Sequence, residues 1–237
     1  LPQALIDLAV TRPLVVSDCD VQAAPDHLKR LVQPLADAKV GMVICPYAVQ
    51  GARSLPDRLE ALRLNTEFIP SVVLAQTVGV AVGTGATMAV SRAALDAVGG
   101  FAAFSDDLLE DQKLALRLLE TGHRIELLHD VVGLSAPGIT LAESWRREIR
   151  WSRGIRTTGR LRYLGVAITF FFPLLILAIL AGSSLVWGIV AGLLAVRILL
   201  ALPVARRLGA SLAPADICLL PLRDAMSFTV WCVGLVG

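Results

Sequence analysis

The stretch Leu14-Val15-Val16-Ser17-Asp18-Cys19-Asp20 decides the fold that we expect for this chain. Its apolar residues, two of them β-branched, predict a buried parallel strand. Asp18 and Asp20 follow directly, and the carboxyl end of a strand is where α/β sheets bind ligands. Two aspartates in this spacing suit Mg²⁺ or Mn²⁺, which in turn can hold a diphosphate. The alternative is a plain turn, since Ser and Asp are common turn residues.

Strand-like and helical segments alternate after this stretch. This alternation predicts an α/β fold with a mostly parallel sheet. We expect Pro70 to break or kink the helix that contains it. The expected strands are 14–17, 40–45, 87–91 and 124–128, and the expected helices are 26–32, 55–76, 92–98 and 108–121.

The composition is that of a membrane-associated protein. Of the 237 residues, 55% are hydrophobic, and the mean hydropathy of +0.68 is too high for an ordinary soluble domain. The net charge of +2 gives no indication of a nucleic-acid partner, and none is expected. The four cysteines include no pair with CxxC spacing, so we expect free thiols in a reducing compartment.

The last third of the chain predicts two to three membrane helices. Apolar spans occupy 164–181, 183–205 and 217–237, and about 20 apolar residues cross a bilayer. Seven arginines in 143–163 predict a basic amphipathic helix at the membrane interface and place the α/β domain on the cytosolic face. We expect the membrane to be a bacterial inner membrane. Buried helices of a soluble protein are the alternative. The expected domains are 1–142, 143–163 and 164–237.

Two short motifs in the α/β part are candidates for chemistry. Glu110-Asp111 opens the 108–121 helix, where one carboxylate could act as a general base, although acidic residues also suit the helix dipole at this position. Gly83-Thr84-Gly85 is either a tight turn before a strand or a place where the backbone approaches a sugar closely.

The run Arg147-Glu148-Ile149-Arg150-Trp151 is the most informative basic motif. On a helix, Arg147 and Arg150 lie three residues apart and share a face. Two guanidiniums on one face form a fork for a diphosphate, and Trp151 could stack on a sugar or a lipid chain. A basic helix lying on the membrane, with Trp151 at the headgroup level, explains the same residues.

Taken together, these motifs resemble the family 2/21-type membrane glycosyltransferases. The similarity is greatest to the ceramide glucosyltransferase branch and its bacterial relatives associated with hopanoid biosynthesis. It covers nearly the whole chain. The residues that carry the resemblance are Ser17-Asp18-Cys19-Asp20, Gly85-Ala86-Thr87-Met88, Gly99-Gly100-Phe101, Glu110-Asp111, Arg147-x-x-Arg150-Trp151, Pro221-Leu222-Arg223-Asp224 and Ser227-Phe228 to Trp231.

The resemblance implies a GT-A nucleotide-diphospho-sugar transferase domain followed by C-terminal transmembrane helices. It would place Asp18 near the nucleotide and on the metal site, and Asp20 on the divalent metal ion. It would make Asp111 the catalytic base, with Glu110 beside it. It would place three side chains over the diphosphate and the acceptor, those of Arg147, Arg150 and Trp151.

The chain departs from the family pattern at two positions. Gln112 follows Glu-Asp where this branch usually has an aromatic residue, and Cys19 stands between the two aspartates where Ser is commoner. Both differences affect what can be inferred about the acceptor. The family's uracil-binding aspartate would lie ahead of Leu1, so we expect a fragment that lacks part of its donor site.

The expected activity is an inverting transfer of a hexose or N-acetylhexosamine. The donor is expected to be a UDP-sugar, and the acceptor a membrane lipid hydroxyl, either of ceramide or of a hopanoid polyol. Two alternatives are a processive polysaccharide synthase of the cellulose or hyaluronan type and a non-catalytic membrane protein. Arg147 in the first position of the basic motif and the short membrane part favour the lipid acceptor.

Overall fold

The computed structural model describes residues 12–80, 82–170, 172–210 and 212–236. The chain forms two compact units, each built from two separate stretches of sequence. Unit 1 consists of Leu1–Ala48 and Ile69–Ser135, and unit 2 consists of Val49–Phe68 and Ala136–Gly237. The domain limits expected at 142 and 163 remain predictions, since they divide the chain into a catalytic, an interfacial and a membrane part.

The main sheet of unit 1 is mixed, so the prediction of a mostly parallel sheet is wrong. Its strand order is β1-β5-β3-β6. Strand β5 is antiparallel to both β1 and β3, whereas β3 and β6 are parallel, so β1, β3 and β6 all run in one direction. Hydrophobic periodicity reports which faces are buried and not the direction of a strand. The strands are β1 Leu14–Ser17, β3 Val40–Ile44, β5 Thr87–Val90 and β6 Arg124–Leu127.

Strand β1 forms where expected, but it is not buried. Val15 is 38% exposed and Val16 is 36% exposed. The strand stands at the end of the sheet, with β5 as its neighbour, and therefore lacks the cover that the three apolar residues had suggested. The prediction of a buried parallel strand is corrected to an exposed antiparallel edge strand.

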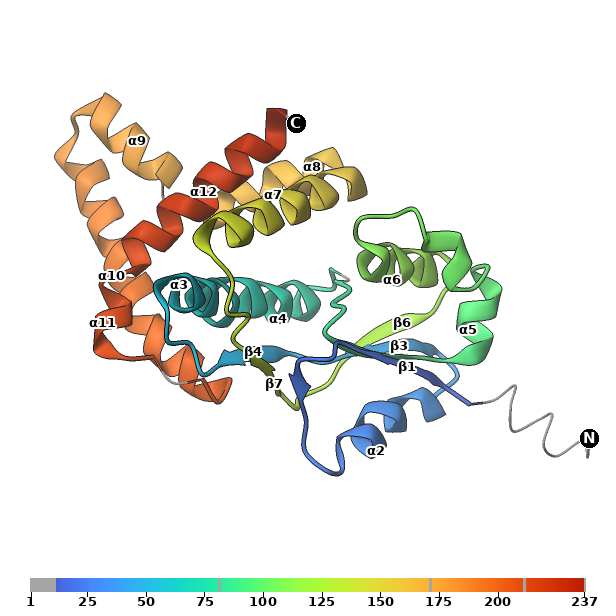
Figure 1. Cartoon of the computed structure of the whole chain (residues 1–237). Helices are drawn as coiled ribbons and strands as arrows, with labels where there is room; N and C mark the ends of the chain where they lie inside the picture. Colours follow the sequence, from blue (N-terminus) through green and yellow to red (C-terminus); the bar gives the residue numbers. More distant parts are fainter. Residues whose placement is uncertain (1–11, 81, 171, 211, 237) are drawn as a thin grey trace, which may run out of the picture. The chain divides into compact units, whose positions relative to one another are not determined.

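Helices cover both faces of this sheet (Figure 1), with α2 on one side and α5 and α6 on the other. One core cluster joins Leu31 of α2 to Val40, Val43 and Ala89 of the sheet. A register shift between Val40 and Met42 allows both valines to face α2. The helices of unit 1 are α2 His27–Val32, η1 Gln33–Ala36, α4 Ile69–Thr77, α5 Arg92–Ala97, η3 Phe101–Phe104 and α6 Glu110–Glu120.

A second sheet was not predicted. Its strand order is β2-β7-β4. With two residues, β2 is too short for a recognisable alternation of side chains. The strands of this sheet are β2 Val21–Gln22, β4 Tyr47–Gln50 and β7 Val132–Ser135.

All four cysteines, Cys19, Cys45, Cys218 and Cys232, are free, as expected.

Unit 2 is helical, and Pro70 does not end the helical run that precedes it. Instead, the segment before it is a π-helical turn, η2. The carbonyl of Thr66, four residues before Pro70, cannot accept a hydrogen bond from a proline nitrogen. It accepts one from Arg197 Nη1 at 2.9 Å. The helices of unit 2 are α3 Leu55–Arg63, η2 Leu64–Phe68, α7 Leu141–Thr158, α8 Arg160–Gly165, η4 Val166–Thr169, α9 Phe172–Ala181, α10 Ser184–Arg207, α11 Pro214–Ile217 and α12 Leu220–Val236.

The basic segment is helical, as expected. Helix α7 begins with a capping box in which Thr140 Oγ1 accepts from the Glu143 nitrogen and Glu143 Oε2 accepts from the Thr140 nitrogen. It ends before Gly159, after which α8 begins. Location at a membrane interface remains a prediction for this segment.

Among the described residues, one helix is long and apolar enough to cross a membrane, Ser184–Arg207. The other two expected spans are not shown as transmembrane helices. The first is divided between α8, η4 and α9, which has 10 residues. Helix α12 has 17 residues and buries Arg223 and Asp224 within unit 2. Apolar composition alone shows neither a break in a helix nor the protein partners of its charged residues. Positions 171 and 237 of these spans lie outside the described residues.

Candidate active site

The Asp-x-Asp motif lies beside the loop that precedes β5. The register of β1 and β5 pairs Ser17 with Thr87, and the next contact is a hydrogen bond from the Asp18 nitrogen to the Ala86 oxygen at 2.9 Å. Because β5 runs opposite to β1, the end of one strand meets the beginning of the other. The side chains of Asp18 and Asp20 are exposed at this edge of the sheet.

The glycine loop before β5 packs against the first turn of α6. The Gly83 nitrogen donates to Gln112 Oε1 at 2.8 Å. A Cβ atom on Gly83 would lie 2.3 Å from the Asp111 carbonyl oxygen, and one on Gly85 would lie 3.2 Å from Asp111 Oδ2. The close backbone approach expected at these glycines is therefore made to α6. Gln112, noted as a departure from the family pattern, ties the loop to that helix.

Acidic side chains gather at this edge of the sheet. Burial, and then the charges of Asp20 and Glu110, raise the pKa of Asp18. Burial also raises the pKa of Asp111 to about 6, with a smaller contribution from Glu110 and an opposing hydrogen bond from the Gln112 nitrogen. The structure thus brings the carboxylates of β1 and α6 into one electrostatic cluster.

The two acidic residues at the start of α6 point to different surroundings. Asp111 is half-buried against Gly85. Glu110 lines a pocket of about 290 Å³ together with Asp107 and Ser105, and the apolar lining comes from Met88, Phe101, Phe104 and Leu114. Asp111 therefore contacts the glycine loop, and Glu110 lines the pocket.

The carboxylates fit a divalent cation that binds together with a diphosphate. Within the described residues, no group of three or more His, Cys, Asp or Glu side chains could hold a metal ion. Asp18 and Asp20 supply two exposed hard oxygen ligands, and their mutual repulsion would be relieved by a cation. Mg²⁺ is commonly held by one or two carboxylates plus substrate phosphates and water, which matches this donor set.

The basic motif belongs to unit 2. Arg147 forms an ion pair with Glu60 at 3.0 Å, and its guanidinium carbon lies 5.2 Å from the centroid of the Trp151 ring. Arg150, on the same helix, is exposed. Of the two guanidiniums in the expected fork, that of Arg147 therefore already has a carboxylate partner. The assignment of Arg147, Arg150 and Trp151 to the diphosphate remains a prediction.

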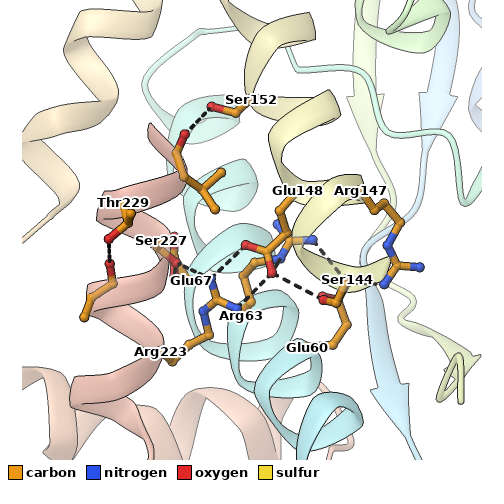
Figure 2. Close-up of polar contacts among 12 residues, drawn as sticks. Glu60, Arg63, Glu67, Ser144, Arg147, Glu148, Ser152, Arg223, Ser227 and Thr229 are labelled. Carbon is orange, nitrogen blue, oxygen red and sulfur yellow. Dashed lines mark hydrogen bonds and ion pairs between the residues drawn. The ribbon is translucent and has the colours of Figure 1, made fainter. Parts of the chain in front are cut away.

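A buried network of charges lies around this motif and was not predicted (Figure 2). Arg223 is fully buried, and its Nη1 and Nη2 donate to the two carboxylate oxygens of Glu148 at 2.9 and 2.7 Å. Arg63 binds Glu60 at 3.3 Å. The one sequence signal for this network was the pair Arg223-Asp224 inside an apolar span.

The chain is similar to one protein family and to a solved structure. The model of glycosyl transferase family 21 matches residues 4–237. A mannosyltransferase from Pyrobaculum calidifontis, solved in complex with GDP-Man and Mn²⁺, is similar at 20% identity with a TM-score of 0.45. The match covers 99% of this chain and 64% of that chain. With the family model matching almost every residue, the chain belongs to glycosyl transferase family 21.

Proposed function

We propose that the chain is part of an inverting glycosyltransferase that moves a hexose or N-acetylhexosamine from a UDP-sugar to a hydroxyl of a membrane lipid. The observation that carries this proposal is the carboxylate cluster of unit 1. In it, Asp111 is half-buried beside the glycine loop with a pKa of about 6, and the charge of the adjacent Glu110 contributes to raising the pKa of both Asp111 and the exposed Asp18. Membership of glycosyl transferase family 21 supports it.

Asp111 is the proposed general base. A carboxylate with a pKa of about 6 is a stronger proton acceptor than an ordinary aspartate, yet it is still ionised at pH 7. In an inverting transfer the acceptor hydroxyl attacks the anomeric carbon while the nucleoside diphosphate leaves from the other side. Asp111 takes the hydroxyl proton as the new glycosidic bond forms.

Asp20 and Asp18 are the proposed ligands of a divalent ion. When bound, such an ion offsets the negative charge of the leaving diphosphate. The protein supplies two carboxylates, and the charge of Asp20 adds to the effect of burial in raising the pKa of Asp18. Arg147, Arg150 and Trp151 are the residues proposed to bind the diphosphate and the acceptor.

The pocket beside Glu110 supports an acceptor that is apolar near its reacting hydroxyl. Phe101, Phe104 and Met88 line one part of it, and Glu110 and Ser105 supply polar groups. Such a combination suits a lipid alcohol better than a fully hydroxylated sugar chain. Ceramide and hopanoid polyols are the proposed acceptor classes.

We also propose a membrane location, with the catalytic part on the cytosolic face. The helix Ser184–Arg207 has the length and composition for a span, and its exposed residues include Leu185, Leu199 and Leu200. Arginines of α7 and of the end of α10 agree with a cytosolic orientation.

The test is product analysis with the full-length protein in membranes. A panel of UDP-sugars is offered with ceramide, diacylglycerol and hopanoid polyols, and the products are identified by mass. A single sugar added to a lipid supports the proposal. A polymer would instead indicate a processive polysaccharide synthase, and no product from any pair would indicate a non-catalytic membrane protein.

A further inference from the structure

Two arginines on different helices lie over the same tryptophan ring. The guanidinium carbon of Arg63, at the end of α3, is 4.9 Å from the centroid of Trp151, and that of Arg147 is 5.2 Å from it. Both distances are within the range of cation–π attraction. The ring of Trp151 is therefore held by one cation from α3 and one from its own helix, α7.

Glu60 joins these two arginines (Figure 2). Its Oε1 lies 3.0 Å from Arg147 Nη2 and 3.3 Å from Arg63 Nη2. Ser144 donates to the other carboxylate oxygen at 3.3 Å. Because one carboxylate binds both guanidiniums that flank Trp151, moving Glu60 would release both cations from the ring.

The surroundings make this arrangement rigid. Glu60 is only 1% exposed, and the side chain of Arg63 is 12% exposed. Burial alone would raise the pKa of Glu60, but the charges of Arg63 and Arg147 outweigh it and keep the pKa below its usual value. A buried carboxylate that stays ionised exchanges its partners slowly, since breaking one contact leaves a charge uncompensated.

Glu148 offers a natural comparison within the same network. It is also buried, at 4% exposure, and binds Arg223 through two oxygens. Its nearest contact with the pair around Trp151 is an Oε1 to Arg63 Nε distance of 3.9 Å. Glu60 and Glu148 are thus two buried glutamates of one network, of which Glu60 binds Arg147.

We propose that Glu60 is a positioning residue for the Arg147-x-x-Arg150-Trp151 segment. By neutralising Arg147 and fixing it on the Trp151 ring, Glu60 sets the orientation of that ring before substrate arrives. The exposed Arg150 is then the cation of this segment that meets the diphosphate. The inference rests on the proposed function and assigns different tasks to the two arginines of the motif.

The first readout reports position without depending on catalysis. The full-length protein is labelled with 5-fluorotryptophan, and the ¹⁹F resonance of Trp151 is assigned as the one lost in Trp151→Phe. In Glu60→Gln, which keeps the shape but removes the charge, the Trp151 resonance should shift or broaden. In Glu148→Gln, the matched control, it should stay in place.

The second readout is the dependence of turnover on donor concentration. We expect Glu60→Gln to raise the KM for the UDP-sugar about tenfold, because a misplaced binding group weakens the donor complex. Arg150→Gln should raise it by a similar factor, since it removes the cation itself. Glu148→Gln should change the KM less than twofold, even if it lowers the melting temperature as much as Glu60→Gln does.

The outcomes separate this inference from the function on which it rests. A shifted Trp151 resonance with a raised donor KM, both confined to Glu60→Gln, supports the positioning role. An unmoved resonance, or a KM that follows the melting temperature equally in the two glutamate variants, overturns it while leaving the transferase activity intact. An unsubstituted protein that turns over no nucleotide sugar overturns the proposed function and this inference with it.

Discussion

The two units of this chain use acidic residues in opposite ways. In unit 1, the pKa of Asp18 is raised by burial and by the charges of Asp20 and Glu110. In unit 2, Glu60 and Glu148 are buried but ion-paired with arginines, and the pKa of Glu60 is lowered. One cluster is unbalanced and partly exposed, and the other is balanced and buried.

This difference separates a ligand site from a structural network. Like charges held together cost stability, so they persist where a bound cation or a reacting group uses them. Paired charges inside a protein add little net stability, but each is strongly destabilising to lose alone. Substitutions in the two units should therefore have opposite effects on activity and on stability.

The largest effect is expected from Asp111→Asn. It keeps the shape and removes the base, so turnover should fall by about 10²–10⁴-fold with little change in donor binding. In the unsubstituted protein, turnover should fall as the pH drops through about 6, because protonated Asp111 cannot accept the hydroxyl proton. The measurement is kcat as a function of pH at saturating substrate.

Glu110→Gln is the control for this variant. It changes the neighbouring residue in the same turn of α6, which lines the pocket. It should cost less turnover than Asp111→Asn. If Glu110→Gln is the inactive variant and Asp111→Asn still turns over, the assignment of the base is wrong. If both are near the unsubstituted rate, the two residues serve the helix dipole.

Arg223→Met should test the balanced network of unit 2. It leaves Glu148 buried without its bidentate partner, which typically costs about 3–5 kcal/mol of unfolding free energy. The measurement is the denaturation midpoint of the purified protein. The double variant Glu148→Gln with Arg223→Met should recover part of the loss, because the uncompensated carboxylate is removed. A double variant less stable than the single one would contradict the ion-pair explanation.

Asp20→Ala should test the unbalanced cluster of unit 1. We expect metal-dependent turnover to fall by about 100-fold, because one of the two proposed metal ligands is lost. The fold should be retained, since the side chain is exposed at a strand end. Circular dichroism checks the fold, and titration with Mn²⁺ checks the metal dependence. Turnover within about threefold of the unsubstituted protein would exclude Asp20 as a metal ligand.

The smallest effect is a gain in stability in Asp111→Asn. The pKa of Asp111 is raised from 3.8 to about 6 on folding, so the folded state is favoured while Asp111 is protonated. This contribution to stability is fully present below pH 3.8 and is lost as the pH rises through about 6. Removing the charge should therefore stabilise the protein at pH 7 by about 1–2 kcal/mol, after allowance for the partial exposure of the side chain.

Glu60→Gln should do the opposite at the same pH. Its carboxylate has a lowered pKa, so its ion pairs contribute to stability at pH 7. This contribution is lost as the pH falls from the ordinary pKa of a glutamate through the lowered pKa of Glu60. Melting temperatures of both variants at pH 4 and pH 7 check the two signs. Two shifts of the same sign would show that the contrast between the units is not electrostatic.

Local patterns in the sequence determined several features of the molecule. The segments of β1, β3, β5 and β6, and the helices α2, α5 and α6, lie within one or two residues of their expected bounds. These elements are marked by local signals, such as the apolar face that α6 presents through Leu114 and Leu118. The family was indicated as well, because its motifs are short and occur in a fixed order along the chain.

Only the tertiary structure decided how these parts are used. The direction of β5 and the exposure of β1 depend on which strands become neighbours, and a local pattern does not contain that information. The close contact between Gly83 and α6 joins residues far apart in sequence. The same holds for Glu60 and Arg147, whose charges would appear as solvated surface until the folding of α3 and α7 buries them together. Burial sets the cost of a charge, and burial is a property of the folded chain.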